Sequence, residues 1–271
     1  MFWWKIKIIY KGNTELTNLY LFNQKCTGIQ ELDNNSAIAF FDSSIDIESL
    51  KFFLDKLDIE YQIDKQEQQN WLNKWKKNFK PVNIENTFLI YPPWEKPKEN
   101  IKYKIIIEPN LAFGTGTHQT TQLMLRLMKE LSFKEKTVLD IGTGSGILSF
   151  AAALLEANSV TSIEIDTTAI KYAHKNNTEF NKLNNIYFIN GTIDCIKNKF
   201  DIILINIISS IQKGILQNIH RFLLEDSTII SSGILIEEDV EFTEFLISSG
   251  FKIIKKKTQD EWIAYHIEQE K

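Results

Sequence analysis

Cysteine and histidine are scarce in this sequence, and their scarcity excludes several kinds of site. The two cysteines, Cys26 and Cys195, lie far apart along the chain, which argues against a disulfide framework and against a cysteine-built metal centre. We expect both to be reduced thiols. The four histidines show none of the close spacings that are typical of zinc sites. The sequence therefore predicts no metal site.

Long apolar runs and an excess of positive charge are absent as well. The most apolar stretches, such as 202–208, have the length of a strand and are too short to cross a bilayer. The first residues, Met1 to Ile6, lack the pattern of a signal peptide. A formal net charge of −4 disfavours nonspecific binding of nucleic acid, which depends on neutralising phosphates. We expect a soluble, cytoplasmic monomer that binds neither membrane nor nucleic acid directly.

Residues 1–65 have the pattern of a small α+β domain. Alternating and β-branched residues predict strands, and turn residues or an apolar helical face separate them. The expected elements are a strand at 2–10, a helix at 13–22, strands at 28–32 and 37–41, a helix at 46–57 and a strand at 59–63. This β-α-β-β-α-β order is that of a ferredoxin-like fold.

Residues 66–100 are predicted to form an ordered connector. Trp71, Trp75 and Phe79 recur every four residues and form one aromatic face on an otherwise polar helix. The simplest interpretation is that this stripe packs on the adjacent domain. Four prolines, at 81, 92, 93 and 97, punctuate the rest of the segment.

From residue 101 to residue 271 strands alternate with helices, which predicts an α/β domain. Strands are expected at 137–141, 160–165, 186–189, 202–206 and 227–231, with helices at 147–156, 167–182, 211–224 and 237–249. Near-continuous apolar strands between helices indicate a doubly wound parallel sheet that is covered on both faces. The tail, 251–257 and 262–267, is expected to form a β-hairpin, which departs from the dehydrogenase arrangement of two repeated halves.

A glycine-rich turn from Asp140 to Gly146 joins the first of these strands to a helix. Glycine lets a ligand approach the backbone without a Cβ in the way, so Gly142 and Gly144 are candidate cofactor contacts. A dinucleotide fingerprint needs a third glycine at position 147, which is Ile147. The observed spacing suits a methionine-bearing nucleoside. The alternative is a tight turn that binds nothing.

Three further segments place polar groups near this turn. Glu164, at the end of the second strand, is a candidate for accepting hydrogen bonds from both ribose hydroxyls, whereas Asp166 is placed to cap the following helix. Asn206 ends a buried strand, and ligands of open α/β sheets bind at those ends. The loop at 108–121 is rich in glycine and hydroxyl groups, which favours binding over a plain surface turn.

Taken together, these segments resemble the bacterial ribosomal protein L-eleven methyltransferases. The most specific match is the loop Leu111-Ala112-Phe113-Gly114-Thr115-Gly116-Thr117-His118, followed by Thr120-Thr121. The turn at 140–148, Asn206-Ile207 and 232–235 follow in the family's order, and Trp71, Trp75, Trp94 and Glu261-Trp262 match its connector and closing strand. The resemblance covers essentially the whole chain, more loosely over residues 1–65.

The resemblance implies an S-adenosylmethionine-dependent protein-lysine methyltransferase. Residues 101–271 would form its Rossmann-like domain with an antiparallel last strand, and residues 1–65 would grip the ribosomal protein. The implied substrates are the N-terminal α-amine and the lysine ε-amines of ribosomal protein L-eleven. Carried over by position, Thr121, Gly142, Glu164 and Asn206 are the implied cofactor contacts.

This sequence departs from the family's pattern at several positions. Thr143 stands where cysteine is usual, Glu164 stands where aspartate is usual, and Asn110 replaces a glycine. Residues 207–210 also differ from the usual sequence after the asparagine, which bears on the acceptor side of the site.

For the chemistry, Asn206 is expected to orient the neutral amine through its side-chain carbonyl. His118 could relay a proton or simply hydrogen-bond within its loop. The alternatives are a methyltransferase with a different protein or small-molecule substrate, a binding module without activity, and a nicotinamide-dependent oxidoreductase. The glycine spacing and the terminal hairpin oppose the last of these.

Overall fold

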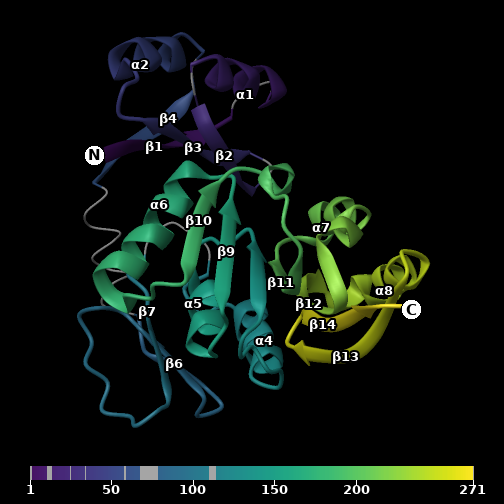
Figure 1. The fold of residues 1–271 in the computed structure, drawn as a ribbon. Helices are drawn as coiled ribbons and strands as arrows, with labels where there is room; N and C mark the ends of the chain where they lie inside the picture. The colour runs from purple at the N-terminus through teal and green to yellow at the C-terminus, as the bar shows by residue number, and fades with distance from the viewer. Residues whose placement is uncertain are drawn as a thin grey trace. The chain divides into compact units, whose positions relative to one another are not determined.

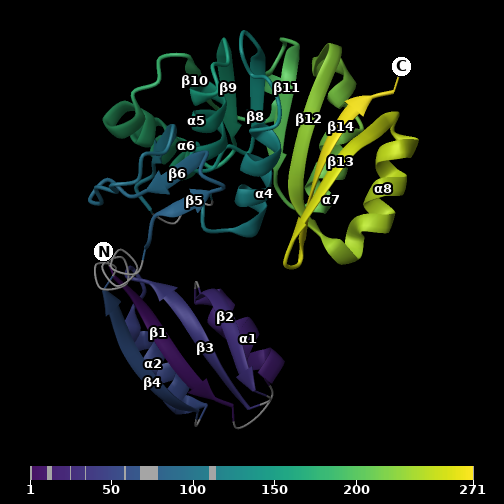
Figure 2. The same ribbon diagram turned by 90° about the horizontal axis from the view of Figure 1, so that it is seen from below.

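The computed structural model describes residues 2–10, 14–24, 26–33, 35–57, 59–67, 79–109 and 114–270. The chain divides into two compact units, Met1–Phe79 and Lys80–Lys271. Each unit has its own hydrophobic core. Figures 1 and 2 show the course of the chain through its helices and strands.

The smaller unit contains one four-stranded sheet. Its elements follow the expected order: β1 (Phe2–Ile9), α1 (Thr14–Asn23), β2 (Cys26–Asp33), β3 (Ser36–Asp42), α2 (Ile47–Lys56) and β4 (Glu60–Glu67). The strand order is β2-β3-β1-β4, and every neighbouring pair is antiparallel. Figure 1 shows both helices on the same side of this sheet. The core between them contains Ile6, Ile8, Leu21, Ala39, Phe41, Leu50 and Leu54.

Local sequence explains where helix α2 begins and which side it buries. The Asp46 carboxylate accepts hydrogen bonds from the backbone N–H groups of Glu48 and Ser49, which caps the first turn. Leu50 and Leu54, one turn apart, are both buried. The helix predicted at 46–57 is therefore confirmed.

The segment expected to connect the two domains, 66–100, is divided between the two units. Gln66 and Glu67 extend β4 beyond the predicted end of that strand. Trp71 and Trp75, and with them most of the predicted aromatic helix, lie outside the described residues. Phe79, the last residue of the stripe, is buried.

Residues 80–100 belong to the larger unit. Here β5 (Val82–Ile84), β6 (Phe88–Tyr91) and β7 (Tyr103–Ile106) form a three-stranded sheet in the order β5-β6-β7. Ile84, Phe88 and Ile90 are almost fully buried and join the core of the main sheet. Burial of these apolar side chains gives the physical reason why this stretch is part of the domain and not a free connector.

The main sheet of the larger unit has seven strands. They are β8 (Thr137–Ile141), β9 (Ser159–Glu164), β10 (Ile186–Asn190), β11 (Phe200–Asn206), β12 (Leu223–Leu235), β13 (Phe251–Gln259) and β14 (Trp262–Gln269). The order is β10-β9-β8-β11-β12-β14-β13, which Figure 2 shows across the sheet from left to right. The pairs from β10 to β12 are parallel, and β14 is antiparallel to both of its neighbours. The predicted α/β class, the parallel strands and the antiparallel last strand are confirmed.

Helices cover both faces of this sheet. They are α4 (Gln119–Met128), α5 (Ile147–Leu154), α6 (Thr167–Lys175), α7 (Ser209–Leu216) and α8 (Asp239–Ser248). Successive residues of β11 alternate between two cores: Ile202 and Leu204 join the core with α4 and α5, whereas Ile203 and Ile205 join the core with α7 and α8. This alternation explains why β11 is apolar throughout.

Two of the predicted helices need correction, and one helix was missed. The missed helix is α4, which carries residues 120 and 121. The helix predicted at 167–182 ends at Lys175 and continues as a π-helical turn, Asn176–Asn181. The helix predicted at 211–224 ends at Leu216, and Leu223 already belongs to β12, because its pairing with Phe200 extends the sheet.

In the part of the chain that the structure describes, no helix combines the length and the apolar character needed to cross a bilayer.

A fully buried carboxylate supports the glycine turn at the end of β8. The Asp140 side chain accepts hydrogen bonds from the hydroxyls of Thr143 at 2.7 Å and Ser149 at 2.6 Å. Ser149 also pairs with Ser162 of β9 at 2.6 Å. Burial raises the pKa of Asp140 to about 6, because desolvation disfavours the charged form more than these hydrogen bonds favour it. The turn is thus tied to the first turn of α5 and to β9.

Asp140 should make the stability of the larger unit depend on pH. Its pKa in the folded state lies above the value of about 4 expected in the unfolded chain, so the folded state retains a proton that the unfolded state releases. The free energy of unfolding therefore falls as the pH rises through this window, by about 1 kcal/mol between pH 5 and pH 8. Asp140→Asn should remove this dependence, as measured by urea unfolding at both pH values.

Asp201→Asn provides the matched control. Burial acts to raise the pKa of Asp201, but hydrogen bonds from Thr137 and Lys136 outweigh it and keep that pKa below its usual value. Asp201 is therefore charged in both states above pH 5, and its replacement should change stability equally at the two pH values. A wild-type pH slope that survives in Asp140→Asn would refute the assignment.

Candidate functional site

A cavity of about 740 Å³ opens at the carboxyl ends of the parallel strands of the larger unit. Residues that directly follow β8, β9, β10 and β11 line it, together with residues near the start of α4 and one residue each from β12 and β14. The lining residues from these strand ends include Gly142, Gly144, Glu164, Asp166, Gly191, Thr192, Asn206 and Ile207. Four of the five predicted site residues, Gly142, Gly144, Glu164 and Asn206, are thus brought together.

Gly142 forms the part of the wall where the backbone itself meets the cavity. Its φ of +72° lies in the left-handed region, and a Cβ at this position would approach Cγ2 of Ile207 to 2.8 Å. The N–H groups of Gly142 and Thr143 both donate to the carbonyl of Ile163, at 2.9 and 3.1 Å. Another residue here would be strained and would press on Ile207, so glycine suits both the conformation and the close approach.

Glu164 presents a carboxylate to the cavity from the end of β9. Oε2 accepts the N–H of Gly144 at 3.1 Å, and Oε1 accepts the N–H of Asp166 at 3.0 Å. Each oxygen of a carboxylate can accept a second hydrogen bond, so the group remains able to bind two hydroxyls. Asp166 caps α6 by accepting from the N–H of Thr168 at 2.7 Å, as the sequence predicts.

Asn206 contributes a buried side chain whose hydrogen bonding is incomplete. The residue is 9% exposed, and its Nδ2 lies 3.5 Å from Oγ1 of Thr121, the outer limit of a hydrogen bond. Its buried Oδ1 accepts no hydrogen bond from any residue that the structure describes. A buried carbonyl oxygen without a partner is costly, which is typical of a group that meets a ligand.

Thr121 occupies a different place from the one predicted. It is fully buried in the first turn of α4 and is not among the described residues that line the cavity, whereas its neighbour Thr120 is. Successive helical residues point in directions about 100° apart, and here it is Thr120 that lines the cavity. Thr121 contacts Asn206 instead.

The loop before α4 reaches the cavity through His118. Residues 110–113, which include Leu111 to Phe113 of the predicted loop, lie outside the described residues. Nδ1 of His118 accepts the N–H of Thr120 and so caps α4, and the imidazole lies edge-on to Trp262 of β14, with ring centroids 5.1 Å apart. Burial lowers the pKa of His118, which favours the neutral imidazole. Both rings line the cavity.

Asn176 anchors this loop and was missed in the sequence. It is 1% exposed in the π-helical turn, where Oδ1 accepts the N–H of Glu108 at 3.0 Å and Nδ2 donates to the carbonyl of Ser145 at 3.1 Å. Ser145 in turn donates from its hydroxyl to the carbonyl of Gly114 at 2.5 Å. The feature of the sequence that could have indicated it is the asparagine pair, Asn176-Asn177. Asparagine is a poor helix former, so two in a row within a predicted helix call for another explanation.

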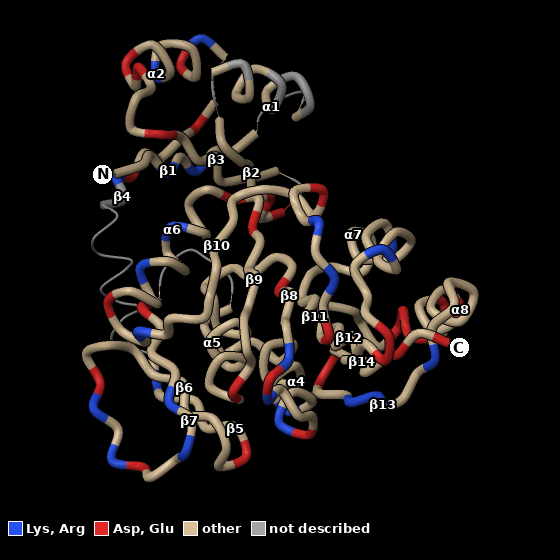
Figure 3. Tube along the Cα trace, viewed as in Figure 1, with Lys and Arg blue, Asp and Glu red and all other residues tan. Residues whose placement is uncertain are grey.

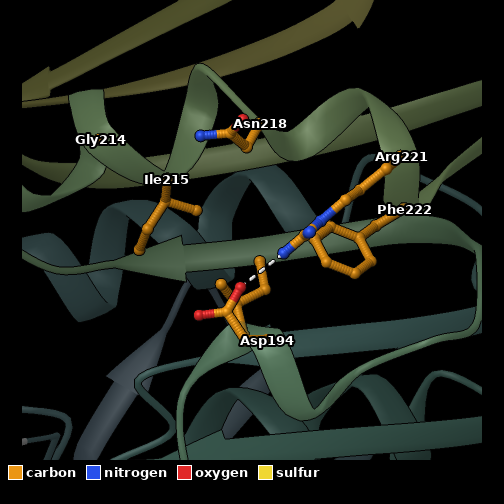
Figure 4. A pocket seen from close by; sticks show the side chains of 7 residues that line it. Asp194, Gly214, Ile215, Asn218, Arg221 and Phe222 are labelled. Atoms are coloured by element: carbon orange, nitrogen blue, oxygen red, sulfur yellow. Dashed lines mark hydrogen bonds and ion pairs between the residues drawn. The ribbon is translucent and has the colours of Figure 1, made fainter.

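Ile193 and Ile215 form a wall between the cavity and a smaller depression of about 350 Å³. Figure 4 shows this depression, with the Arg221 guanidinium reaching the Asp194 carboxylate at 2.7 Å. The ion pair joins the segment after β10 to the turn before β12. Because both partners are more than half exposed, we expect it to contribute little to stability.

Within the described ranges, no group of three or more histidine, cysteine, aspartate or glutamate side chains could hold a metal ion. Cys26, which is buried, and Cys195, which is exposed, are both free thiols.

Comparison with known proteins identifies the family. The family model described as ribosomal protein L11 methyltransferase (PrmA) matches residues 10–270. Curated proteins named ribosomal protein L11 methyltransferase are similar to this chain. The one from Carboxydothermus hydrogenoformans is 39% identical over 72% of this chain, and the one from Anoxybacillus flavithermus is 36% identical over 73%. These alignments span 65% and 64% of the relatives, so the matched part is less than two thirds of their length.

A solved structure agrees with this match. The crystal structure of ribosomal protein L11 methylase from Lactobacillus delbrueckii subsp. bulgaricus is 31% identical, with a TM-score of 0.67. The similarity covers 71% of this chain and 100% of that chain. The family model extends across both compact units, and the resemblance predicted from the sequence is confirmed. The chain therefore belongs to the ribosomal protein L11 methyltransferase family.

Proposed function

We propose that this protein transfers methyl groups from S-adenosylmethionine to the lysine ε-amines and the N-terminal α-amine of ribosomal protein L11. The names of its relatives support this substrate. The observation that carries the proposal is the buried Oδ1 of Asn206, which meets no partner among the described residues and lines a cavity with the glycine turn. A neutral amine is a hydrogen-bond donor that fits this oxygen.

The residues around the cavity fit a methionine-bearing nucleoside. The Glu164 carboxylate would accept hydrogen bonds from the ribose hydroxyls, and Gly142 and Gly144, which line the cavity, would present backbone without a Cβ to the ligand. Isoleucines line much of the remaining wall and would pack on a flat base: Ile163, Ile165, Ile193, Ile211 and Ile215. When bound, this cofactor supplies a methyl group on a sulfonium, together with its own leaving group.

The chain's part in the reaction is then to orient the amine and to exclude water. A lysine ε-amine has a pKa near 10.4 and must lose its proton before it can attack. The carboxamide of Asn206 cannot remove a proton, but its oxygen can hold the neutral amine in one orientation. Thr121 would act through Asn206, whose Nδ2 it contacts, and not by touching the cofactor. The neutral imidazole of His118 also lines the cavity, but its Nδ1 lone pair accepts the N–H of Thr120, so we assign it to holding the loop and not to proton transfer.

We further propose that the smaller unit is a ferredoxin-like domain that grips ribosomal protein L11. Its β-α-β-β-α-β order and its antiparallel strand order β2-β3-β1-β4 support this fold. Its core contains no residue of the larger unit. Recognition of a protein substrate would then depend on the smaller unit, whereas cofactor binding would depend on the larger unit alone.

Asn206→Ala should leave the fold intact and reduce kcat about 100-fold or more, because the amine loses its orienting partner. The measurement is incorporation of radiolabelled methyl groups from S-adenosylmethionine into purified ribosomal protein L11. Asn218→Ala, which changes an exposed asparagine outside the cavity, is the control and should retain full turnover. Wild-type turnover by Asn206→Ala would remove Asn206 from the mechanism.

Deletion of residues 1–79 should separate the two proposed roles. The remaining chain keeps both cores of the α/β unit, so we expect it to bind S-adenosylmethionine with wild-type affinity in calorimetry. Methylation of ribosomal protein L11 should fall to background because the substrate is no longer gripped. Full methylation by the truncated chain would show that the smaller unit does not recognise the substrate.

A further inference from the structure

Gln212 is a fully buried amide beneath the candidate site. It lies on α7, one turn before the buried Leu216, and its side chain is 0% exposed. Burying an amide is costly unless its polar atoms find partners. Here both ends do: Nε2 donates to the carbonyls of Ile207 at 2.5 Å and Ser232 at 2.6 Å, and Oε1 accepts the hydroxyl of Ser231 at 2.5 Å.

These three partners lie where β11 leaves the sheet. In the parallel ladder, Ile205 pairs with Ser231 and Asn206 pairs with Ser232, and the pairing ends there. The next residue, Ile207, has no ladder partner in β12. Gln212 supplies the next connection, because its side-chain amide donates to the carbonyls of both Ile207 and Ser232. It thus extends the connection between the two strands by one residue beyond Asn206.

Close packing on the other side confines Ile207 as well. Gly233 has a φ of +94°, and a Cβ at this position would overlap the carbonyl oxygen of Ile207. The Ile207 side chain in turn lies so close to Gly142 that a Cβ there would meet its Cγ2 at 2.8 Å. The peptide that follows Asn206 is therefore held by the Gln212 amide and packed between two glycines, Gly142 and Gly233, that line the cavity.

We propose that Gln212 is a positioning residue for the Asn206 carboxamide. Among the described residues, the Asn206 side chain makes one hydrogen bond, the 3.5 Å approach to Thr121, which is too weak to fix its direction alone. The orientation of its Oδ1 therefore depends on the backbone on either side of it. The ladder with β12 holds one side, and Gln212 holds the other. This inference rests on the proposed methyl transfer for its kinetic readout.

Gln212→Leu tests the proposal. Leucine retains the bulk of the side chain but donates no hydrogen bond, so Ile207 is released. We expect kcat for methyl transfer to ribosomal protein L11 to fall about 10- to 100-fold, with little change in the affinity for S-adenosylmethionine measured by calorimetry. Leu216→Ala is the matched control, because it opens a space under the same helix but leaves the hydrogen bonds of Gln212 in place. Below its own unfolding temperature, it should retain kcat within about twofold of wild type.

A double-mutant cycle shows whether Gln212 acts through Asn206. In the Asn206→Ala background, Gln212→Leu should lower kcat no further, since the group that it positions is already gone. An equal further loss in that background, or an unchanged kcat in the single variant, would overturn the proposal. Equal losses in Gln212→Leu and Leu216→Ala would also overturn it, because both would then report destabilisation alone.

A second readout does not depend on activity. The side-chain N–H pair of Asn206 can be assigned by its absence from the ¹⁵N spectrum of Asn206→Ala. This pair should shift in Gln212→Leu and remain in place in Leu216→Ala, and an unshifted pair in Gln212→Leu would contradict the positioning role. If the wild-type protein transferred no methyl to ribosomal protein L11, the proposed function would fail, whereas this spectrum would still decide the role of Gln212.

Discussion

The parallel hydrogen-bond ladder through β9, β8 and β11 is the constraint on which the candidate site depends. Ile141 pairs with Ile163 on one side and with Ile205 on the other. The next residue in each strand is Gly142, Glu164 or Asn206. Parallel strands run in one direction, so three segments far apart in the sequence meet in a single row at the edge of the sheet. Strand register therefore brings the members of the site together, and the hydrogen bond from Gly144 to Glu164 adds a direct contact between two of them.

Buried polar side chains fix the backbone around these strand ends through hydrogen bonds. Asp140 ties the glycine turn to α5, Asn176 ties the loop before α4 to Ser145, and Gln212 ties the exit of β11 to β12. Each is almost completely buried, and each has hydrogen bonds that offset much of the cost of burial. Loops that carry function must adopt irregular backbone conformations, and such side chains provide the hydrogen bonds that a regular ladder would otherwise supply.

Much of this arrangement can be predicted from the sequence. Apolar runs located all five parallel strands, because strands that are covered on both faces must be apolar at nearly every position. Helix boundaries were less predictable. Leu223 could have continued a helix, but its pairing with Phe200 places it in β12. Residues 80–100, punctuated by proline, gave the pattern of a connector, and only their burial against the main core assigns them to the larger unit.

The sequence by itself determined the family, the order of the five parallel strands along the chain and four residues that line the cavity, because these depend on local spacing and on the direction of parallel strands. Tertiary structure decided which neighbouring side chains face the cavity. Thr120 lines it, whereas Thr121 is turned toward Asn206, since the rotation of α4 is set by its packing on the sheet. It also decided the role of Gln212, a polar residue whose partners come from separate strands. Hydrogen bonds between distant segments exist only once the chain has folded, so no local pattern predicts them.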